Sequence, residues 1–388
     1  MTDQREASAV ARAAGILRAE AANGLFWGSG EAETARLHQI RRHAAALLSE
    51  VDPRPRKGIE AVFDRDRNLR TPIPGTELRV RCADGRTVVH RRRLRGGFET
   101  LSLRLANVAM ALRTDMAGEV AGIADTDLAG LPCPHTYLLV YETDTPLDST
   151  EAAAELASLA PTDPDLDGEI PSLPPVDSAV EVIARDPLPV TPAAAAILAK
   201  VAALSEESLE AAENVYARER HERILALCRD TAEIDGPYER VHCGDISADC
   251  VSTGADAAIF DDRDRILLIR RTDTGQWAMP GGAAEVGEPV GLASVREAAE
   301  ETGLNVALTG LVCAFDKREV GYADSRVPMI MCFAARMIAP EQPIRLEELE
   351  ATEYRWAGED ELDSIDFFRG HQYRVPAAFA ARAGETDR

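Results

Sequence analysis

Residues 282–304 read GAAEVGEPVGLASVREAAEETGL and predict a loop followed by a short helix. Pro289 suits the first position of that helix, where its missing N–H costs nothing, and Gly303 suits the position just past the end. Small and aliphatic side chains fall on one side of the helix, so this side can pack on a sheet. The other side carries three glutamates within about a third of the circumference: Glu297, Glu300 and Glu301.

These three carboxylates repel one another and destabilise the helix unless a cation lies among them. Mg²⁺ suits such a site because it prefers oxygen ligands and is usually shared between a few carboxylates and substrate phosphates. We therefore expect the three glutamates to bind Mg²⁺, with Mn²⁺ as a possible substitute. An isolated acidic run is more often a solvated helix face, but the glycine-rich loop, Glu288 and Arg296 favour the metal site.

Arg296 precedes the first helix glutamate and can hold Glu288 or Glu300 in a bidentate ion pair. The alternative is an exposed salt bridge of little energetic value. Upstream of the helix, the run WAMPGG at 277–282 contains glycines that let the backbone approach an ion closely. Its Trp277 is as consistent with a core position as with the wall of a substrate cleft.

Seven positions in this stretch keep a spacing that resembles the Nudix box, the signature of pyrophosphohydrolases acting on nucleoside diphosphates linked to another group. They are Gly282, Glu288, Arg296, Glu297, Glu300, Glu301 and Gly303. The match is complete at the charged and glycine positions and departs mildly at Ala298, where the family prefers a larger aliphatic residue.

The resemblance implies catalytic roles for Arg296 and the three helix glutamates, with Glu301 as the central metal ligand. It also implies a metal contact from the Gly282 carbonyl and structural roles for Glu288 and Gly303. Candidate substrate contacts are Trp277, Gly281 and Arg318. The general base stays open between a box glutamate and five acids outside the box: Glu319, Glu347, Glu348, Glu350 and Glu353.

The length and charge of the chain limit its architecture and partners. With 388 residues the chain exceeds one typical core, so we expect more than one domain. A formal charge of −23 argues against a nucleic-acid polymer as partner. Seven scattered cysteines, no signal-peptide pattern and no apolar run long enough for a bilayer predict a cytoplasmic protein without membrane association.

The C-terminal part, 249–388, alternates strands and helices. Its order fits the α/β/α sandwich with a mixed sheet that Nudix domains have. We expect strands at 256–260, 265–270, 311–315, 329–334 and 354–356, and a final helix at 376–382.

The N-terminal part, 1–190, is predicted to be a helix-rich α+β domain of unknown function. We expect helices over 1–50 and 98–116, short strands over 59–89 and a buried strand at 137–141. A helical connector follows at 191–248. Its segment ENVYARERHERILALCRDTAEI is similar to the helix that precedes the catalytic domain in Nudix hydrolases of ADP-ribose-like or CDP-alcohol substrates. A comparable pattern after Asn23 is either a diverged repeat or an ordinary amphipathic helix.

The sequence thus favours Mg²⁺-dependent hydrolysis of a small nucleotide, with ADP-ribose or a nucleotide sugar as the first expectation. A house-cleaning pyrophosphatase for nucleoside triphosphates is the enzymatic alternative. A nucleotide-sensing regulator is the non-enzymatic one, although sensors need no metal chemistry and all four box glutamates are present. The alanine-rich helices also allow a homodimer.

Overall fold

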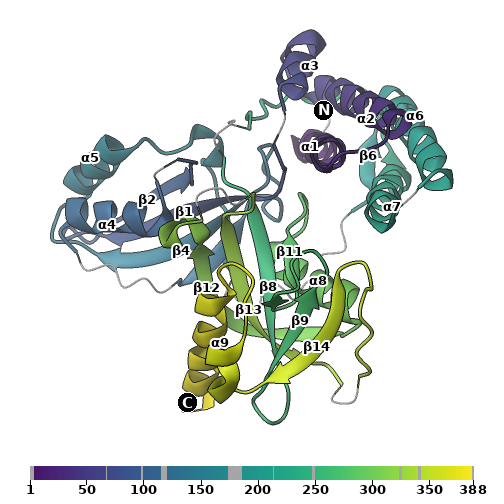
Figure 1. The fold of residues 1–388 in the computed structure, drawn as a ribbon. Coiled ribbons are helices and arrows are strands. Elements are labelled where there is room, and N and C mark those ends of the chain that lie inside the picture. Colours follow the sequence, from purple (N-terminus) through teal and green to yellow (C-terminus); the bar gives the residue numbers. More distant parts are fainter. Residues whose placement is uncertain are drawn as a thin grey trace.

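A computed structural model describes residues 4–66, 68–97, 99–114, 120–173, 186–212, 214–246, 250–322, 326–339 and 342–386. The chain forms three neighbouring parts: a helical bundle, a five-stranded sheet and a seven-stranded sheet (Figure 1). No helix in the described part of the chain is long and apolar enough to cross a membrane. All seven cysteines lie in described segments, and none forms a disulfide.

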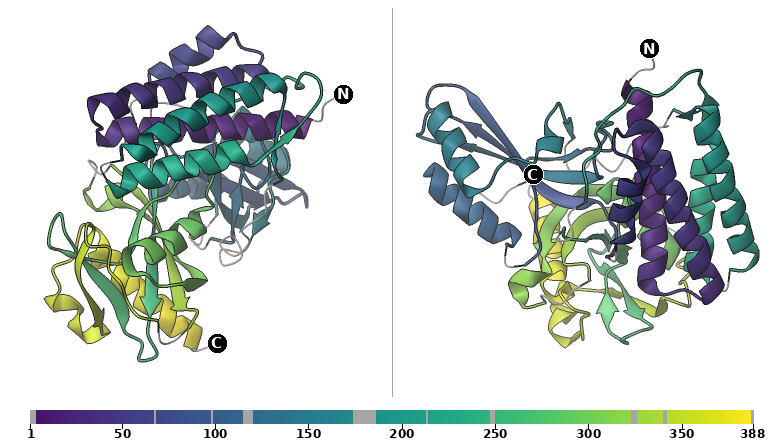
Figure 2. Two further views of the ribbon diagram at one scale, coloured as in Figure 1. Left: turned by 90° about the vertical axis from the view of Figure 1, so that its right-hand side faces the viewer. Right: turned by 90° about the horizontal axis from the view of Figure 1, so that it is seen from above.

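Two helical hairpins build the bundle. The first consists of α1 (Gln4–Trp27) and α2 (Glu31–Val51), and the second of α6 (Pro192–Glu210) and α7 (Val215–Arg229). Alanines on α1 and α2 let the helices approach closely around one apolar cluster. The four helices lie side by side, so the connector expected at 191–248 contributes half of the bundle (Figure 2).

A short helix, α3 (Arg56–Asp64), replaces the strand expected from residue 59 onward. Ile59 and Phe63 are four residues apart and are both buried, so they lie on one face of a helix turn. The prediction of a strand there was wrong because helical and strand periodicity cannot be distinguished in so short a segment.

The five-stranded sheet has the order β2-β1-β4-β3-β5. Its strands are β1 (Ile73–Arg81), β2 (Thr87–Arg93), β3 (Gly122–Asp125), β4 (Thr136–Asp144) and β5 (Ser172–Leu173). Helix α4 (Leu101–Leu112) connects β2 to β3 and α5 (Ser149–Leu159) follows β4. The helix expected over 98–116 is therefore present as α4, although residues 98 and 115–119 lie outside the described residues. Smaller elements are η1 (Pro164–Leu166), β6 (Leu188–Val190) and β7 (Thr231–Glu233).

The seven-stranded sheet has the central order β10-β9-β8-β13-β12, with β11 paired to β8 and β14 to β9. Its strands are β8 (Thr253–Phe260), β9 (Ile266–Arg271), β10 (Trp277–Ala278), β11 (Gly281–Ala283), β12 (Val306–Asp316), β13 (Met329–Met337) and β14 (Ala351–Ala357). Two 3₁₀ turns, η3 (Lys317–Val320) and η4 (Glu359–Ser364), complete the loops.

Helix α8 (Val290–Thr302) covers one face of this sheet and α9 (His371–Thr386) covers the other (Figure 1). Strands β8 and β13 are parallel, whereas the neighbouring pairs are antiparallel. The α/β/α sandwich with a mixed sheet, preceded by a helix-rich α+β region, is therefore confirmed.

Candidate active site

Helix α8 begins and ends close to where the sequence predicts. Pro289 is its N-cap residue, and Gly303 follows its last turn in the left-handed conformation with φ of 70°. That conformation favours glycine, which has no Cβ to clash with the backbone. Val290, Ala293 and Ala298 are buried against the sheet, which fixes the helix and turns its acidic side toward strand β11.

Glu301 and Glu297 face the glycine strand that leads into the helix. Glu301 is only 4% exposed and accepts a hydrogen bond of 2.8 Å from the Gly281 N–H. The carboxylate of Glu297 lies so close to Gly282 that a Cβ at this position would be 2.6 Å from its oxygen. Because glycine has no Cβ, the Glu297 carboxylate can lie directly against the strand at Gly282.

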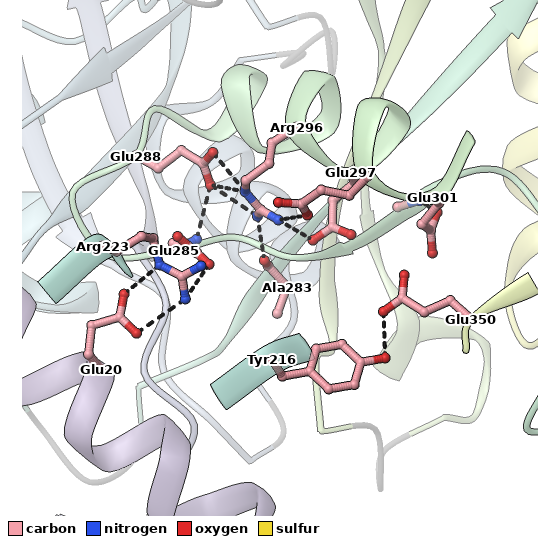
Figure 3. Close-up of polar contacts among 12 residues, drawn as sticks. Glu20, Tyr216, Arg223, Ala283, Glu285, Glu288, Arg296, Glu297, Glu301 and Glu350 are labelled. Atoms are coloured by element: carbon pink, nitrogen blue, oxygen red, sulfur yellow. Dashed lines mark hydrogen bonds and ion pairs between the residues drawn. The ribbon is translucent and has the colours of Figure 1, made fainter. Parts of the chain in front are cut away.

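Arg296 holds the other carboxylates of the box in place (Figure 3). Its guanidinium donates to Glu288 at 3.0 Å, to Glu297 at 2.9 Å and to Glu300 at 2.8 Å. It also reaches the Ala283 carbonyl at 3.2 Å. The expected pair with Glu288 is present, and the half-buried guanidinium ties the loop to the helix rather than forming an isolated surface salt bridge.

The surroundings of Glu297 and Glu301 disfavour the ionised form of both carboxyl groups. Burial raises the pKa of Glu297 to about 8, against the opposing charge of Arg296. Burial also raises the pKa of Glu301 well above its ordinary value, and the charges of Glu297 and Glu350 raise it further. Burial alone would lower the pKa of Arg296, but Glu297 and Glu288 outweigh it and raise that pKa. The site therefore favours positive charge.

Glu350 lies across from helix α8, just before strand β14, and its carboxylate points toward that of Glu301 (Figure 3). The Tyr216 hydroxyl donates a hydrogen bond of 2.6 Å to Glu350. Burial and the acceptor Glu350 together raise the pKa of this phenol. Of the acids that the sequence left open as general base, Glu350 is thus placed beside the two buried helix glutamates.

One face of helix α7 lies over the site and carries Tyr216, Glu219 and Arg223 at helical spacing. Arg223 binds Glu285 in the box loop at 2.8 Å and Glu20 of helix α1 at 2.9 Å (Figure 3). Burial raises the pKa of Glu285 to about 7, and Arg223 opposes this rise. Burial and the charge of Glu300 also raise the pKa of Glu219. The helical bundle therefore forms part of the site.

The donor set fits a hard divalent cation in its chemistry. The half-buried Glu297 and the buried Glu301 both have raised pKa values, and a cation would remove the repulsion between their carboxylates. The close approach of the Glu297 carboxylate to Gly282 is a second sign of fit, because a Cβ at this position would displace the carboxylate. Within the described residues, no three acidic, histidine or cysteine side chains already converge on one point. Glu297 and Glu300 are instead turned toward Arg296.

Other candidates lie further from these acids. Trp277 is half-buried in β10 and packs with the apolar cluster beneath α9, which agrees with the core alternative. Arg318 donates to Asp316 at 2.8 Å and to the Arg95 carbonyl at 3.0 Å. Glu319 accepts the Ser102 N–H at 2.8 Å. Arg318 and Glu319 thus join the catalytic sheet to the first sheet.

Two further acids of the open set, Glu347 and Glu353, have other partners. Glu353 is paired with Arg270 at 3.3 Å on the surface, and Glu347 accepts the Leu349 N–H at 3.3 Å. Tyr216, Arg223 and Glu20 were missed by sequence reasoning. Their separation from the box exceeds any local spacing rule, so only coupled variation among relatives could have indicated them.

Comparison with known proteins agrees with this geometry. Residues 252–378 match the family described as NUDIX domain. A putative 8-oxo-dGTP diphosphatase of Bacillus subtilis (strain 168) is 38% identical over 64 residues, which are 16% of this chain and 43% of that protein. A MutT-like protein of Streptomyces ambofaciens is 30% identical over 98 residues, or 25% of this chain and 58% of that protein. The chain spans about half the length of these curated relatives.

Parts of the chain also match solved structures at low similarity. A crystal structure of UDP-X diphosphatase matches 48% of this chain and 93% of its own, with 19% identity and a TM-score of 0.38. An ADP-ribose pyrophosphatase from Streptococcus suis 89-1591 matches 34% and 91%, with 27% identity and a TM-score of 0.28. The family match and the box geometry are what identify this part of the molecule. Residues 252–378 of this chain therefore form a NUDIX domain.

Proposed function

We propose that this protein hydrolyses the pyrophosphate linkage of a nucleoside diphosphate bound to another group, with ADP-ribose or a nucleotide sugar as the favoured substrate. The observation that carries the proposal is a pair of carboxylates, the buried Glu301 and the half-buried Glu297, on the inner face of α8 beside the glycine strand. A pure ligand sensor has no need to maintain buried, mutually repelling acids, because they destabilise the fold without a cation.

In this proposal Glu297, Glu300 and Glu301 hold Mg²⁺ or Mn²⁺, and Arg296 limits their motion. When bound, the cation supplies positive charge to the substrate phosphates and makes a water molecule more acidic. The strand register favours Gly281 over Gly282 as the backbone contact. Pro280 and Ala284 form backbone hydrogen bonds with β8, and every second residue of an antiparallel strand does so, which includes Gly282 opposite Ala255. The Gly281 N–H instead donates to Glu301.

Glu350 is our candidate for the general base. Its carboxylate lies beside Glu301, and its position outside the box leaves it free to accept a proton from the attacking water. Tyr216 donates to one of its oxygens and so limits its orientation. Arg271, whose charge partly offsets the raised pKa of Glu301, replaces Arg318 as the candidate contact to a substrate phosphate.

The substrate preference rests on helix α7. It contains the segment similar to the helix that precedes ADP-ribose-type Nudix domains, and the structure places one of its faces over the catalytic acids. A rival preference follows from the relative named putative 8-oxo-dGTP diphosphatase, which is 38% identical over 64 residues. We therefore treat oxidised nucleoside triphosphates as the second candidate class.

A substrate panel tests the proposal on the full chain with Mg²⁺ and with Mn²⁺. We expect AMP and a sugar phosphate from ADP-ribose, and less pyrophosphate from nucleoside triphosphates including 8-oxo-dGTP. Glu301→Gln is the matched variant and should show no turnover with any substrate. An unchanged rate in this variant, or a wild-type chain that hydrolyses nothing in the panel, would refute the assignment.

A further inference from the structure

The two sheets of the molecule share one topology. In the first, β2-β1-β4-β3 are neighbours, and in the second β9-β8-β13-β12 are neighbours. Strands β1 and β4 are parallel, as are β8 and β13, and each flanking pair is antiparallel. The order along the chain also agrees, because a hairpin of strands, a helix and two further strands follow one another in both.

The helical hairpins extend this correspondence. Hairpin α1–α2 precedes the first sheet, and hairpin α6–α7 precedes the second. The two hairpins pack against each other in the bundle, and the two sheets share one apolar cluster (Figure 2). Each half of the chain is therefore a hairpin followed by the same sheet, and like parts of the two halves contact one another.

Two contacts between the halves are reciprocal. The loop after β12 reaches the start of helix α4, where Asp316 and Glu319 accept the N–H groups of Leu101 and Ser102 at 3.3 and 2.8 Å. The loop before β4 reaches the start of helix α8, where His135 accepts the Gly287 N–H at 2.8 Å. Such an exchange of equivalent contacts is typical of two copies related by a two-fold axis.

The helices that occupy the equivalent places differ in charge. Helix α8 carries the three box glutamates, whereas α4 reads LSLRLANVAMAL and contains no acidic residue. The first sheet also has no strand that corresponds to the glycine strand β11 among its described strands. The first copy therefore lacks the groups that the candidate active site uses.

We propose that residues 4–173 are a second, catalytically silent copy of the hairpin-plus-sheet unit, which acts as a built-in partner and positions the catalytic loop through His135. We call these residues the silent unit and residues 186–386 the catalytic unit. The claim about turnover rests on the proposed function, whereas the claim about the loop does not.

The geometry at His135 gives it a defined role. Its Nδ1 accepts the Gly287 N–H, so its Nε2 carries the proton and donates to Asp125 at 3.0 Å. The ring is buried, with its side chain only 2% exposed. Asp125 also accepts the N–H groups of Asp127 and Leu128, so it is fixed within the silent unit. His135 is therefore a positioning residue that fixes the loop one position before Glu288.

Hydrogen–deuterium exchange on the full chain tests the loop contact without any substrate. In His135→Ala the Gly287 amide should exchange about tenfold faster, as expected for the loss of one hydrogen bond. In His135→Asn the amide oxygen can take the place of Nδ1, so most of the protection should return. Asp125→Asn keeps the His135 ring and should give an intermediate exchange rate at Gly287. This variant tests the contact even if His135→Ala folds poorly.

The matched control is His90→Ala. His90 is equally buried in the silent unit, but its Nε2 contacts the Ala160 carbonyl at 2.9 Å within that unit. It should lower the melting temperature (Tm) as much as His135→Ala and leave the exchange of Gly287 unchanged. Equal acceleration in both variants would reduce His135 to a general stabilising residue and overturn the proposal, as would an unchanged Gly287 rate in His135→Ala.

Turnover supplies the second measurement, with whichever substrate the wild-type chain hydrolyses. We expect kcat of His135→Ala to fall about tenfold with KM changed less than about twofold, because the loop positions catalytic groups rather than the substrate. His135→Asn should recover most of kcat, and His90→Ala should keep it. Loss of protection at Gly287 with wild-type kcat would overturn the positioning role. An inactive wild-type chain would count against the proposed function alone.

Discussion

Helices α4 and α8 occupy equivalent places in two sheets of the same topology, yet they bury side chains of different kinds. In α8, Glu301 is 4% exposed beside the half-buried Glu297, whereas α4 turns leucines, a valine and one arginine inward. The scaffold therefore does not require acids at this place. Where they occur, they oppose folding through burial and mutual repulsion, so their presence in one unit alone supports the proposal that this unit is the catalytic one.

The largest expected effect is the loss of turnover in Glu301→Gln, in helix α8 of the catalytic unit. We expect turnover to fall by about 10³-fold or more, because the variant loses a carboxylate that the cation requires. The Tm of the metal-free protein should not fall, because burial and Glu297 raise the pKa of this carboxyl and so disfavour its charged form, which the amide does not have. Steady-state kinetics and thermal denaturation check both parts, with the exposed Glu359→Gln as control.

The next largest effect is expected at Glu350, which lies across from α8 in the catalytic unit. Glu350→Gln should lower kcat by about 10²-fold if this residue is the general base. Tyr216→Phe removes only the hydrogen bond to it and should lower kcat by about three- to tenfold. Glu353→Gln, which breaks a surface pair with Arg270, is the control and should remain active. Wild-type turnover in Glu350→Gln would assign the base to another acid.

Glu297 in the catalytic unit should make stability depend on pH. The folded pKa of Glu297 is about 8, above its ordinary value near 4.5. Its contribution is therefore fully present below about pH 4.5 and is lost as the pH rises through about 8. The Tm of the metal-free protein should fall over this range, Glu297→Gln should reduce the fall, and Mg²⁺ should restore the Tm most at high pH. Equal pH profiles for the wild type and Glu297→Gln would contradict this assignment.

The catalytic unit was far more predictable from sequence than the silent unit. Pro289, Gly303 and the Arg296–Glu288 pair all follow from spacing within one helix and its loop, so local rules were sufficient. The same rules could not place Glu350 or Tyr216, since their contact joins residues that are 134 positions apart. It depends on how the bundle packs on the sheet.

The silent unit was not recognised because its equivalent of the signature is gone. Without acids in α4 and without a glycine strand, only the order of strands preserves the relationship, and strand order is not visible in the sequence. The alternative of a diverged repeat was open for the hairpins alone. The structure favours it for the whole unit, because the reciprocal loop contacts involve the sheets as well as the helices.

The smallest expected effect lies in the silent unit, at Arg104 of helix α4. Its side chain is buried, its Nε donates to Thr76 at 2.7 Å, and its Nη2 has no hydrogen-bond partner among the described residues. Burial, with a contribution from Arg92, lowers the pKa of Arg104 to about 10. Arg104→Met keeps most of the aliphatic volume and removes a poorly solvated charge, so we expect the Tm to change by less than about 3 °C.

The turnover of Arg104→Met and Glu301→Gln compares the roles of α4 and α8 directly. Both remove a buried charge from equivalent helices, and neither should unfold the protein. Only the variant in α8 should lose activity, since α4 takes no part in the chemistry. We expect kcat of Arg104→Met to stay within about twofold of wild type. A loss of the size expected for Glu301→Gln, at an unchanged Tm, would show that α4 contributes to catalysis and that the first unit is not silent.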